Sequence, residues 1–160
     1  MSEVGYTPSM QEEFKRLLTV THPAAEDLKV LALIEAAGKS SYAARVRGAP
    51  NDEVRRILAQ NGREEVGHAV RLRRVIKLMY GEDFAIPRDE DNRFVTAADA
   101  VEAVTEEILE RLAQGEILGG NFYDSWASNV DHEEAAQLLR QNGAEERRHA
   151  DRLRQAASLL

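Results

Sequence analysis

The sequence predicts an all-α protein built as an antiparallel four-helix bundle, with a long crossover connection and an extra helix at the N-terminus. Apolar residues recur at intervals of three and four along most of the chain, and glycine and proline are sparse. The second half also repeats the first, 81 residues later: segments 58–73 and 139–154 are identical at eleven of sixteen positions. We therefore expect two duplicated helical hairpins related by a pseudo-two-fold axis.

The extra helix is short and amphipathic and is expected over residues 9–19. Ser9 and Glu12 stand at its start with the spacing of a capping box, in which each side chain accepts a hydrogen bond from the other residue's backbone. We assign this helix to an N-terminal segment, residues 1–22, that precedes the bundle.

The first hairpin is expected to consist of two long helices. The first runs from about Pro23 to Val46 and ends where Gly48 and Pro50 interrupt the helical pattern. Asn51 can cap the second helix, which runs from about Asp52 to Tyr80.

The second hairpin follows a polar, acidic stretch, Gly81 to Phe94, which has no apolar period and is interpreted as the crossover. Thr96 is expected to cap the third long helix, which continues to about Asn129 with a kink near Thr105 or Gly115.

The last helix is expected to start at a second capping-box pattern, Asp131 with Glu134, and to run to the C-terminus. Residues 23–160 would then form one bundle domain, a length that suits a single core.

Composition and charge exclude several classes of function. The net charge of −7 argues against nucleic acid or an anionic membrane as the main partner and favours the approach of cations. The absence of cysteine excludes disulfides, iron–sulfur clusters and thiol catalysis. No signal peptide is visible, and no apolar run reaches the roughly 18 residues of a membrane span, so a cytoplasmic protein is expected.

Six candidate metal ligands recur in register between the two halves of the chain. They are Glu35, Glu65, His68, Glu116, Glu146 and His149. In each half, one helix supplies a single glutamate and the next supplies Glu-x-x-His, whose two side chains share a helix face. This is the pattern that holds a pair of metal ions inside a four-helix bundle. Exposed ion pairs are the alternative, but they do not explain the matched repeat.

Charge balance supports two divalent cations, because four buried glutamates without partners would be prohibitively costly. Carboxylate oxygens with one imidazole per metal suit two iron ions, two manganese ions or a mixed pair better than a structural zinc site, although zinc can substitute. Glu65 and Glu146 would bridge the metals, whereas Glu35 and Glu116 would each bind one.

Several residues beside the ligands are also repeated. Glu64 and Glu145 can accept a hydrogen bond from the histidine of the opposite helix, or they are solvated surface residues. Tyr42 and Tyr123 lie two turns after ligand glutamates, where each can hydrogen-bond a ligand carboxylate, act as a redox-active catalytic phenol, or serve only as core.

Polar residues and one tryptophan complete the set of candidates. An amide hydrogen bond to a ligand carboxylate is expected from Asn61 and Asn142. Arg71 and Arg152 can bind the acids next to the ligands, and Trp126 is expected in the core or an interface. Arg73 and Arg154 are expected to form surface salt bridges. His22 and His132 are expected to cap helices or to lie on the surface.

Four glycines lie one helical turn from the ligands. They are Gly38, Gly62, Gly119 and Gly143. Glycine within a helix costs about 1 kcal/mol relative to alanine, so these positions require an explanation. Close helix packing is one; we favour the other, space beside the metals for dioxygen, peroxide or a small substrate.

At these residues the chain resembles the ferritin-like di-iron carboxylate superfamily, which includes rubrerythrins, bacterioferritins and demethoxyubiquinone hydroxylases. The resemblance covers about residues 23–160. It implies a ferritin-like bundle in which the six residues bind two irons that react with dioxygen or peroxide.

The chain departs from each of these groups. Rubrerythrins carry another glutamate where this chain has Gly119, and commonly a cysteine-ligated domain, which puts a rubrerythrin-type peroxidase activity in question. Bacterioferritins add a fifth helix after the bundle and ligate haem through a methionine; neither is evident here, so a storage cage is not expected. No apolar membrane-docking surface of the hydroxylase kind is visible.

Three functions follow. The first is an oxidoreductase acting on peroxide, dioxygen or Fe(II), with an unknown reductant. The second is a di-metal monooxygenase of a small organic substrate, and the third is a metal-binding protein without turnover. We favour the first, in a homodimer.

Overall fold

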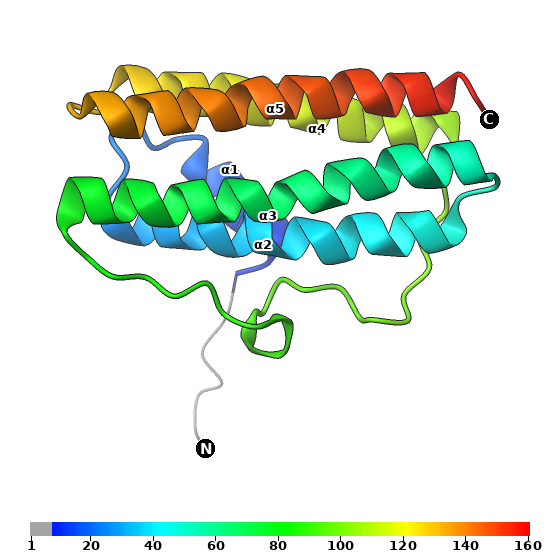
Figure 1. The fold of residues 1–160 in the computed structure, drawn as a ribbon, viewed down its shortest axis with the longest axis horizontal. Helices are drawn as coiled ribbons and strands as arrows, with labels where there is room; N and C mark the ends of the chain where they lie inside the picture. The colour runs from blue at the N-terminus through cyan, green and yellow to red at the C-terminus, as the bar shows by residue number, and fades with distance from the viewer. Residues whose placement is uncertain (1–7) are drawn as a thin grey trace.

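The computed structural model describes residues 8–160, and all the regular secondary structure in this range is helical (Figure 1). The elements are α1 (Met10–Leu17), α2 (Ala25–Gly48), α3 (Asp52–Tyr80), the short 3-10 helix η1 (Asp89–Asp91), α4 (Glu106–Ser128) and α5 (Glu133–Ala157). The predicted all-α bundle is therefore confirmed. Residues 1–7 of the predicted N-terminal segment lie outside the described range.

Two antiparallel hairpins make up the bundle. Helices α2 and α3 form one, α4 and α5 the other, and the hairpins pack together mainly through α3 and α5 (Figure 1). Helices α2 and α4 approach each other much less closely, and α1 lies across this side of the bundle. A cavity, which we call the slot, lies between α2 and α4 and is lined by residues of both helices and of α1.

The predicted capping box of α1 and the predicted bounds of α3 are confirmed, whereas α1 ends at Leu17, short of residue 19, and α2 runs over Ala25–Gly48 and not from about Pro23 to Val46. The hydroxyl of Ser9 accepts a hydrogen bond from the backbone N–H of Glu12, whose carboxylate accepts one from the Ser9 N–H, so the capping box forms. Asn51 caps α3 through the N–H of Val54. Gly81 ends α3 with a φ of 67°, a left-handed conformation that glycine adopts without strain.

The start predicted for the third long helix is wrong. Helix α4 begins at Glu106, capped by Thr105, and continues without a break through Gly115. The stretch after Thr96 instead continues the crossover along α2, where backbone groups find partners outside a helix. The Glu102 N–H, for example, donates to a carbonyl of α2, and Gly48 allows this approach because a Cβ there would lie 1.9 Å from the Glu102 oxygen.

The cap predicted for the last helix is also wrong by one residue. His132, not Asp131, caps α5, with its ring nitrogen accepting from the N–H of Ala135 at 3.2 Å. The helix therefore starts at Glu133, and Glu134 is one position too early for a capping box. The alternative of a capping role for His132 is confirmed.

The core consists of two apolar clusters, with the candidate ligands between them. One cluster includes Leu28, Leu72 and Trp126, and the other includes Leu58 and Leu153. Along each long helix, residues of one cluster precede the ligand positions and residues of the other follow them. The buried polar layer is thus supported by packed side chains above and below it.

Within residues 8–160, no helix is long and apolar enough to span a membrane.

Candidate metal centre

The six predicted ligands converge in the centre of the bundle. Their ligand atoms form two groups within which all atoms lie within 4.8 Å of one another. One group contains Glu35, Glu65, His68 and Glu146, and the other contains Glu65, Glu116, Glu146 and His149. Each group draws on three of the four long helices, so the site requires both hairpins.

Glu65 and Glu146 belong to both groups, which is the arrangement expected of carboxylates that bridge two cations. Each group adds one further glutamate, Glu35 or Glu116, and one histidine. Four carboxylates and two imidazoles would balance two divalent ions, each with an oxygen-rich donor set and a single nitrogen. The geometry therefore fits the predicted pair of metal ions.

The histidines provide a second observation in favour of a metal. The Nδ1 atom of His68 lies 3.5 Å from carboxylate oxygens of Glu35, Glu65 and Glu146. The Nδ1 atom of His149 lies 3.3 Å from Glu65 and 3.5 Å from Glu146. Both nitrogens are buried and lack a hydrogen-bond partner within the described range. Buried polar atoms are normally satisfied, so nitrogens directed at carboxylates in this way are suited to a shared cation.

The opposite ring nitrogens are held by acids of the facing helix. Nε2 of His68 lies 3.0 Å from Glu145, and Nε2 of His149 lies 2.9 Å from Glu64. Each acid also accepts a hydrogen bond from an arginine, Arg71 or Arg152, as anticipated for the repeated residues. The arrangement favours N–H at Nε2 and leaves Nδ1 to face the carboxylates.

The surroundings of these two acids keep them charged. Hydrogen bonding from His68 and the charge of Arg71 lower the pKa of Glu145 to about 2. Partial burial raises the pKa of Glu64, but the hydrogen bonds from Arg152 and His149 outweigh it and hold that pKa below its usual value.

The two asparagines do not bind ligand carboxylates, so that prediction is wrong. The amide of Asn61 donates to the Tyr42 hydroxyl and to the His149 carbonyl, each at 3.2 Å. Asn142 donates in the same way to the carbonyl of His68, also at 3.2 Å. Because the asparagines face a backbone carbonyl of the opposite Glu-x-x-His helix, they tie α3 to α5 next to the ligands.

Both tyrosines bind the glutamate of the other hairpin. Tyr42 donates a hydrogen bond to Glu116, and Tyr123 donates to Glu35 at 2.5 Å. Burial, followed by the charge of the bound glutamate, raises the pKa of each phenol well above its usual value. The phenols are therefore protonated hydrogen-bond donors. The structure favours a role in binding the ligand carboxylates over a role in core packing alone.

Burial also changes the pKa values of the ligand side chains themselves. Burial and the charge of Glu146 raise the pKa of Glu35 to about 8, and burial and the same neighbour raise that of Glu116. Burial lowers the pKa of His149, but the nearby carboxylates of Glu146 and Glu65 outweigh it and raise the value to about 9. Divalent cations bound there would displace these protons.

The four glycines divide into two pairs. Gly38 and Gly119 face ligand carboxylates: a Cβ there would lie 2.9 Å from Glu65 Cγ and 3.5 Å from Glu146 Oε1, respectively. Gly62 and Gly143 instead allow close helix packing, since their Cβ atoms would lie 3.0 and 3.2 Å from the Cβ atoms of the two tyrosines. Gly38 and Gly119 thus leave room for the ligand glutamates themselves, and space there for a small molecule stays a prediction; for Gly62 and Gly143 that expectation is wrong.

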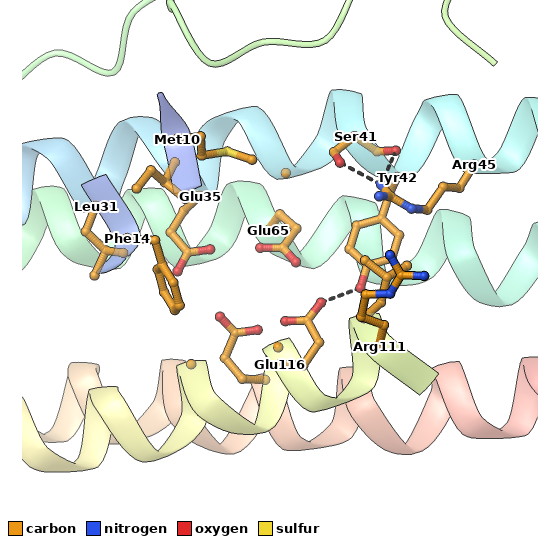
Figure 2. A pocket seen from close by; sticks show the side chains of 16 residues that line it. Met10, Phe14, Leu31, Glu35, Ser41, Tyr42, Arg45, Glu65, Arg111 and Glu116 are labelled. Atoms are coloured by element: carbon orange, nitrogen blue, oxygen red, sulfur yellow. Dashed lines mark hydrogen bonds between the residues drawn. The ribbon is translucent and has the colours of Figure 1, made fainter. Parts of the chain in front are cut away.

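A cavity of about 260 Å³ occupies the slot between α2 and α4 and reaches all four ligand glutamates (Figure 2). Gly38 and Gly119 are part of its wall, and α1 contributes Met10 and Phe14.

Sequence reasoning missed two arginines that line this cavity, Arg45 and Arg111. Arg45 follows Tyr42 by three residues on the ligand face of α2, and this spacing was the available signal.

Residues further from the centre mostly lie as expected. Trp126 is fully buried and donates to the carbonyl of Val20 at 2.8 Å, which confirms its core position. Arg154 pairs with Glu110 at 2.9 Å on the surface, while Arg73 and His22 are exposed.

Comparison with protein-family models matches residues 33–157 to the family described as Rubrerythrin. Searches of curated proteins and of solved structures found no match. The matched range contains all six candidate ligands and most of the bundle.

Proposed function

The chain belongs to the Rubrerythrin family, and from this premise we propose that it binds two iron ions and is an oxidoreductase that reacts with peroxide or dioxygen. One observation carries the proposal: two donor groups, built from both hairpins, share two glutamates and each direct a buried, unpartnered imidazole nitrogen at them. Bound iron would supply the two electrons that, with two protons, reduce peroxide to water or dioxygen to peroxide.

The residues around the ligands would fix the site's geometry. Glu64 and Glu145 set the imidazole orientation from the far side of each ring, and Tyr42 and Tyr123 hold the terminal glutamates through hydrogen bonds. Because these contacts join opposite hairpins, they would hold the ligands in position before a metal binds. Such preorganisation limits the rearrangement that binding or a change of metal charge would require.

Iron is proposed over zinc because of the donor set. Six ligands rich in carboxylate oxygen, without cysteine, suit iron or manganese, and zinc would be a substitute. The proposed small-molecule substrates are peroxide, dioxygen or Fe(II) itself, and the reductant is a separate component. The homodimer expected from the sequence also stays a proposal.

A monooxygenase of a small organic substrate is the second candidate. The cavity that reaches the ligand glutamates favours it, because its wall includes Gly38 and Gly119 and it is large enough for more than a diatomic molecule. The same cavity argues against a metal site shut off from solvent, which a purely structural role would allow.

The test is anaerobic titration of metal-free protein with Fe(II), followed by exposure to peroxide and, separately, to dioxygen. We expect two irons per chain and a visible absorption band of ferric iron after the oxidant is added. Glu35→Ala and His149→Ala should each lose part of the iron and the band, whereas Glu53→Gln, an exposed residue, serves as the control. Iron that binds in this ratio and never reacts would overturn the oxidoreductase proposal.

A further inference from the structure

The cavity between α2 and α4 differs in chemistry from end to end. Three ligand glutamates, Glu35, Glu65 and Glu116, lie along its middle, with an apolar group on one side of them and two arginines on the other (Figure 2). Its volume of about 260 Å³ is close to the lower limit of roughly 300 Å³ for typical small-molecule sites. The cavity therefore suits a short, slender ligand with two different ends.

The apolar end is built partly by the additional N-terminal helix. Met10 and Phe14 of α1 meet Leu31 and Ile34 of α2 there. The ring of Phe14 also packs against Phe122 of α4, with centroids 6.2 Å apart, so α1 bridges the two sides of the slot. This end offers a hydrocarbon chain a surface without charge.

The basic end contains a guanidinium with unused hydrogen-bonding capacity. Arg45 is half-buried, and its Nη1 donates to the carbonyl and hydroxyl of Ser41 at 3.0 and 2.7 Å. Its Nε is buried without a hydrogen-bond partner, and Arg45 forms no ion pair with an acid in residues 8–160. A guanidinium that has no acidic partner is suited to an anionic ligand in the cavity that it lines.

Arg111 adds a second positive charge at this end of the cavity, from α4 on the other side of the slot. Its side chain is 71% exposed, and among the described residues its one ion pair is with Glu107, at 3.4 Å on the surface. Such a weak surface pair is readily exchanged for a better partner. Two arginines on opposite sides of one end of the cavity can bind a carboxylate from two directions.

The charge of the whole cavity favours an anion only when cations occupy the site. Four glutamates would repel a negative ligand, but two divalent ions would neutralise them. Arg45 and Arg111 would then leave the cavity with excess positive charge.

We propose that the metal-loaded protein binds a short aliphatic carboxylic acid in this cavity. The carboxylate would lie against Arg45 and Arg111, and the hydrocarbon chain would pass the metal ligands to the Met10 and Phe14 end. The proposal rests on the proposed function for its bound cations, and it names a substrate class for the same site. It also places carbon atoms of the ligand, and not its carboxylate, beside the metals.

The probe is octanoate, and the measurement is calorimetric titration of zinc-loaded protein, because zinc is inert to redox chemistry. Octanoate is expected to bind, with 1-octanol at least about tenfold weaker, since it lacks the charge that an arginine pair recognises. Arg45→Gln should reduce octanoate affinity about tenfold or more, and Arg45→Lys should restore part of it. Arg73→Gln, exposed on α3 outside this cavity, should have no effect.

The apolar end has its own variant. Phe14→Ala should weaken octanoate severalfold and leave butyrate unchanged, because the shorter chain does not reach α1. Equal affinity for octanoate in Arg45→Gln and the natural chain would overturn the proposal, since the carboxylate would then bind the metals directly or not be recognised.

Zinc content measured on the same samples separates this proposal from the previous one. Two zinc ions per chain without octanoate binding would overturn only the cavity ligand. Failure to bind zinc at all would contradict the metal site itself, and with it both proposals.

Discussion

Among single residues, the orientation of two imidazole rings determines which nitrogen of each histidine faces the ligand carboxylates. Each histidine contacts an acid through Nε2, which leaves Nδ1 to face the ligand carboxylates. Glu64 and Glu145 are thus as important to the geometry as the ligands, although neither belongs to the groups that could hold a cation. Outer hydrogen-bond partners of this kind typically change metal affinity by roughly 10–100-fold when removed.

Glu64→Gln tests this role. The amide can still accept a hydrogen bond from His149, but without the negative charge that favours the correct ring orientation and increases the basicity of the imidazole. We expect metal affinity to fall about tenfold or more, within the usual range for such partners, with Glu145→Gln behaving in the same way because of the repeat. Competition with a chelator measures the affinity.

Glu53→Gln, in an exposed position on the same helix, is the matched control for charge removal. Unchanged affinity in both Glu64→Gln and Glu145→Gln would mean that packing alone orients the rings.

The ligands and their acids were predictable from sequence because their spacing repeats. The partners of Asn61 and Asn142 were not, since each amide reaches a backbone carbonyl of the other hairpin. Such a contact depends on the register between α3 and α5, and no pattern within one helix records that register.

At the scale of helices, glycine sets how closely each hairpin packs. A Cβ at Gly143 would lie 3.0 Å from the backbone oxygen of Gly120 and 3.1 Å from Asp124 Oδ1, so α4 and α5 approach each other there. Gly115 is different, because a Cβ there would meet nothing within 4 Å.

The two positions should therefore respond to alanine in opposite directions. Gly115→Ala is expected to stabilise the protein by up to about 1 kcal/mol through helix propensity. Gly143→Ala is expected to destabilise it, because overpacking costs about 1–3 kcal/mol and the nearest atom is rigid backbone. Urea unfolding of the metal-free proteins measures both, and a stabilised Gly143→Ala would show that the helices can separate at little cost.

Helix boundaries were predictable where the cap is local. Ser9, Asn51 and Gly81 act within one turn of their own helix, and their positions were read correctly. The cap predicted at Thr96 is wrong because this stretch forms hydrogen bonds to α2. This partner is distant in the sequence and competes with helix formation.

At the scale of the whole molecule, the duplicated sequence becomes one shared site. Neither hairpin alone supplies a complete donor group, because each group combines ligands from both. The tyrosines also cross between hairpins, so the repeat is symmetric in its contacts as well as its sequence. The slot between α2 and α4 is the part of the bundle through which small molecules can reach the buried ligands.

The overall bundle was predictable because both the apolar period and the ligand pattern occur twice. The slot was not, since it depends on how far apart α2 and α4 are held and on where α1 packs. Arg45 shares the ligand face of α2, yet only the folded chain shows that its Nε lacks a partner.

Two hairpins, in our proposal, together build one site for two metal ions. The most direct measurement is anomalous diffraction from crystals grown with Fe(II) or Mn(II) under anaerobic conditions. We expect two peaks per chain, separated by roughly 3.5–4 Å, with Glu65 and Glu146 between them and one histidine on each. A single peak, or metal bound only outside these six residues, would rule out a two-metal site shared by the hairpins.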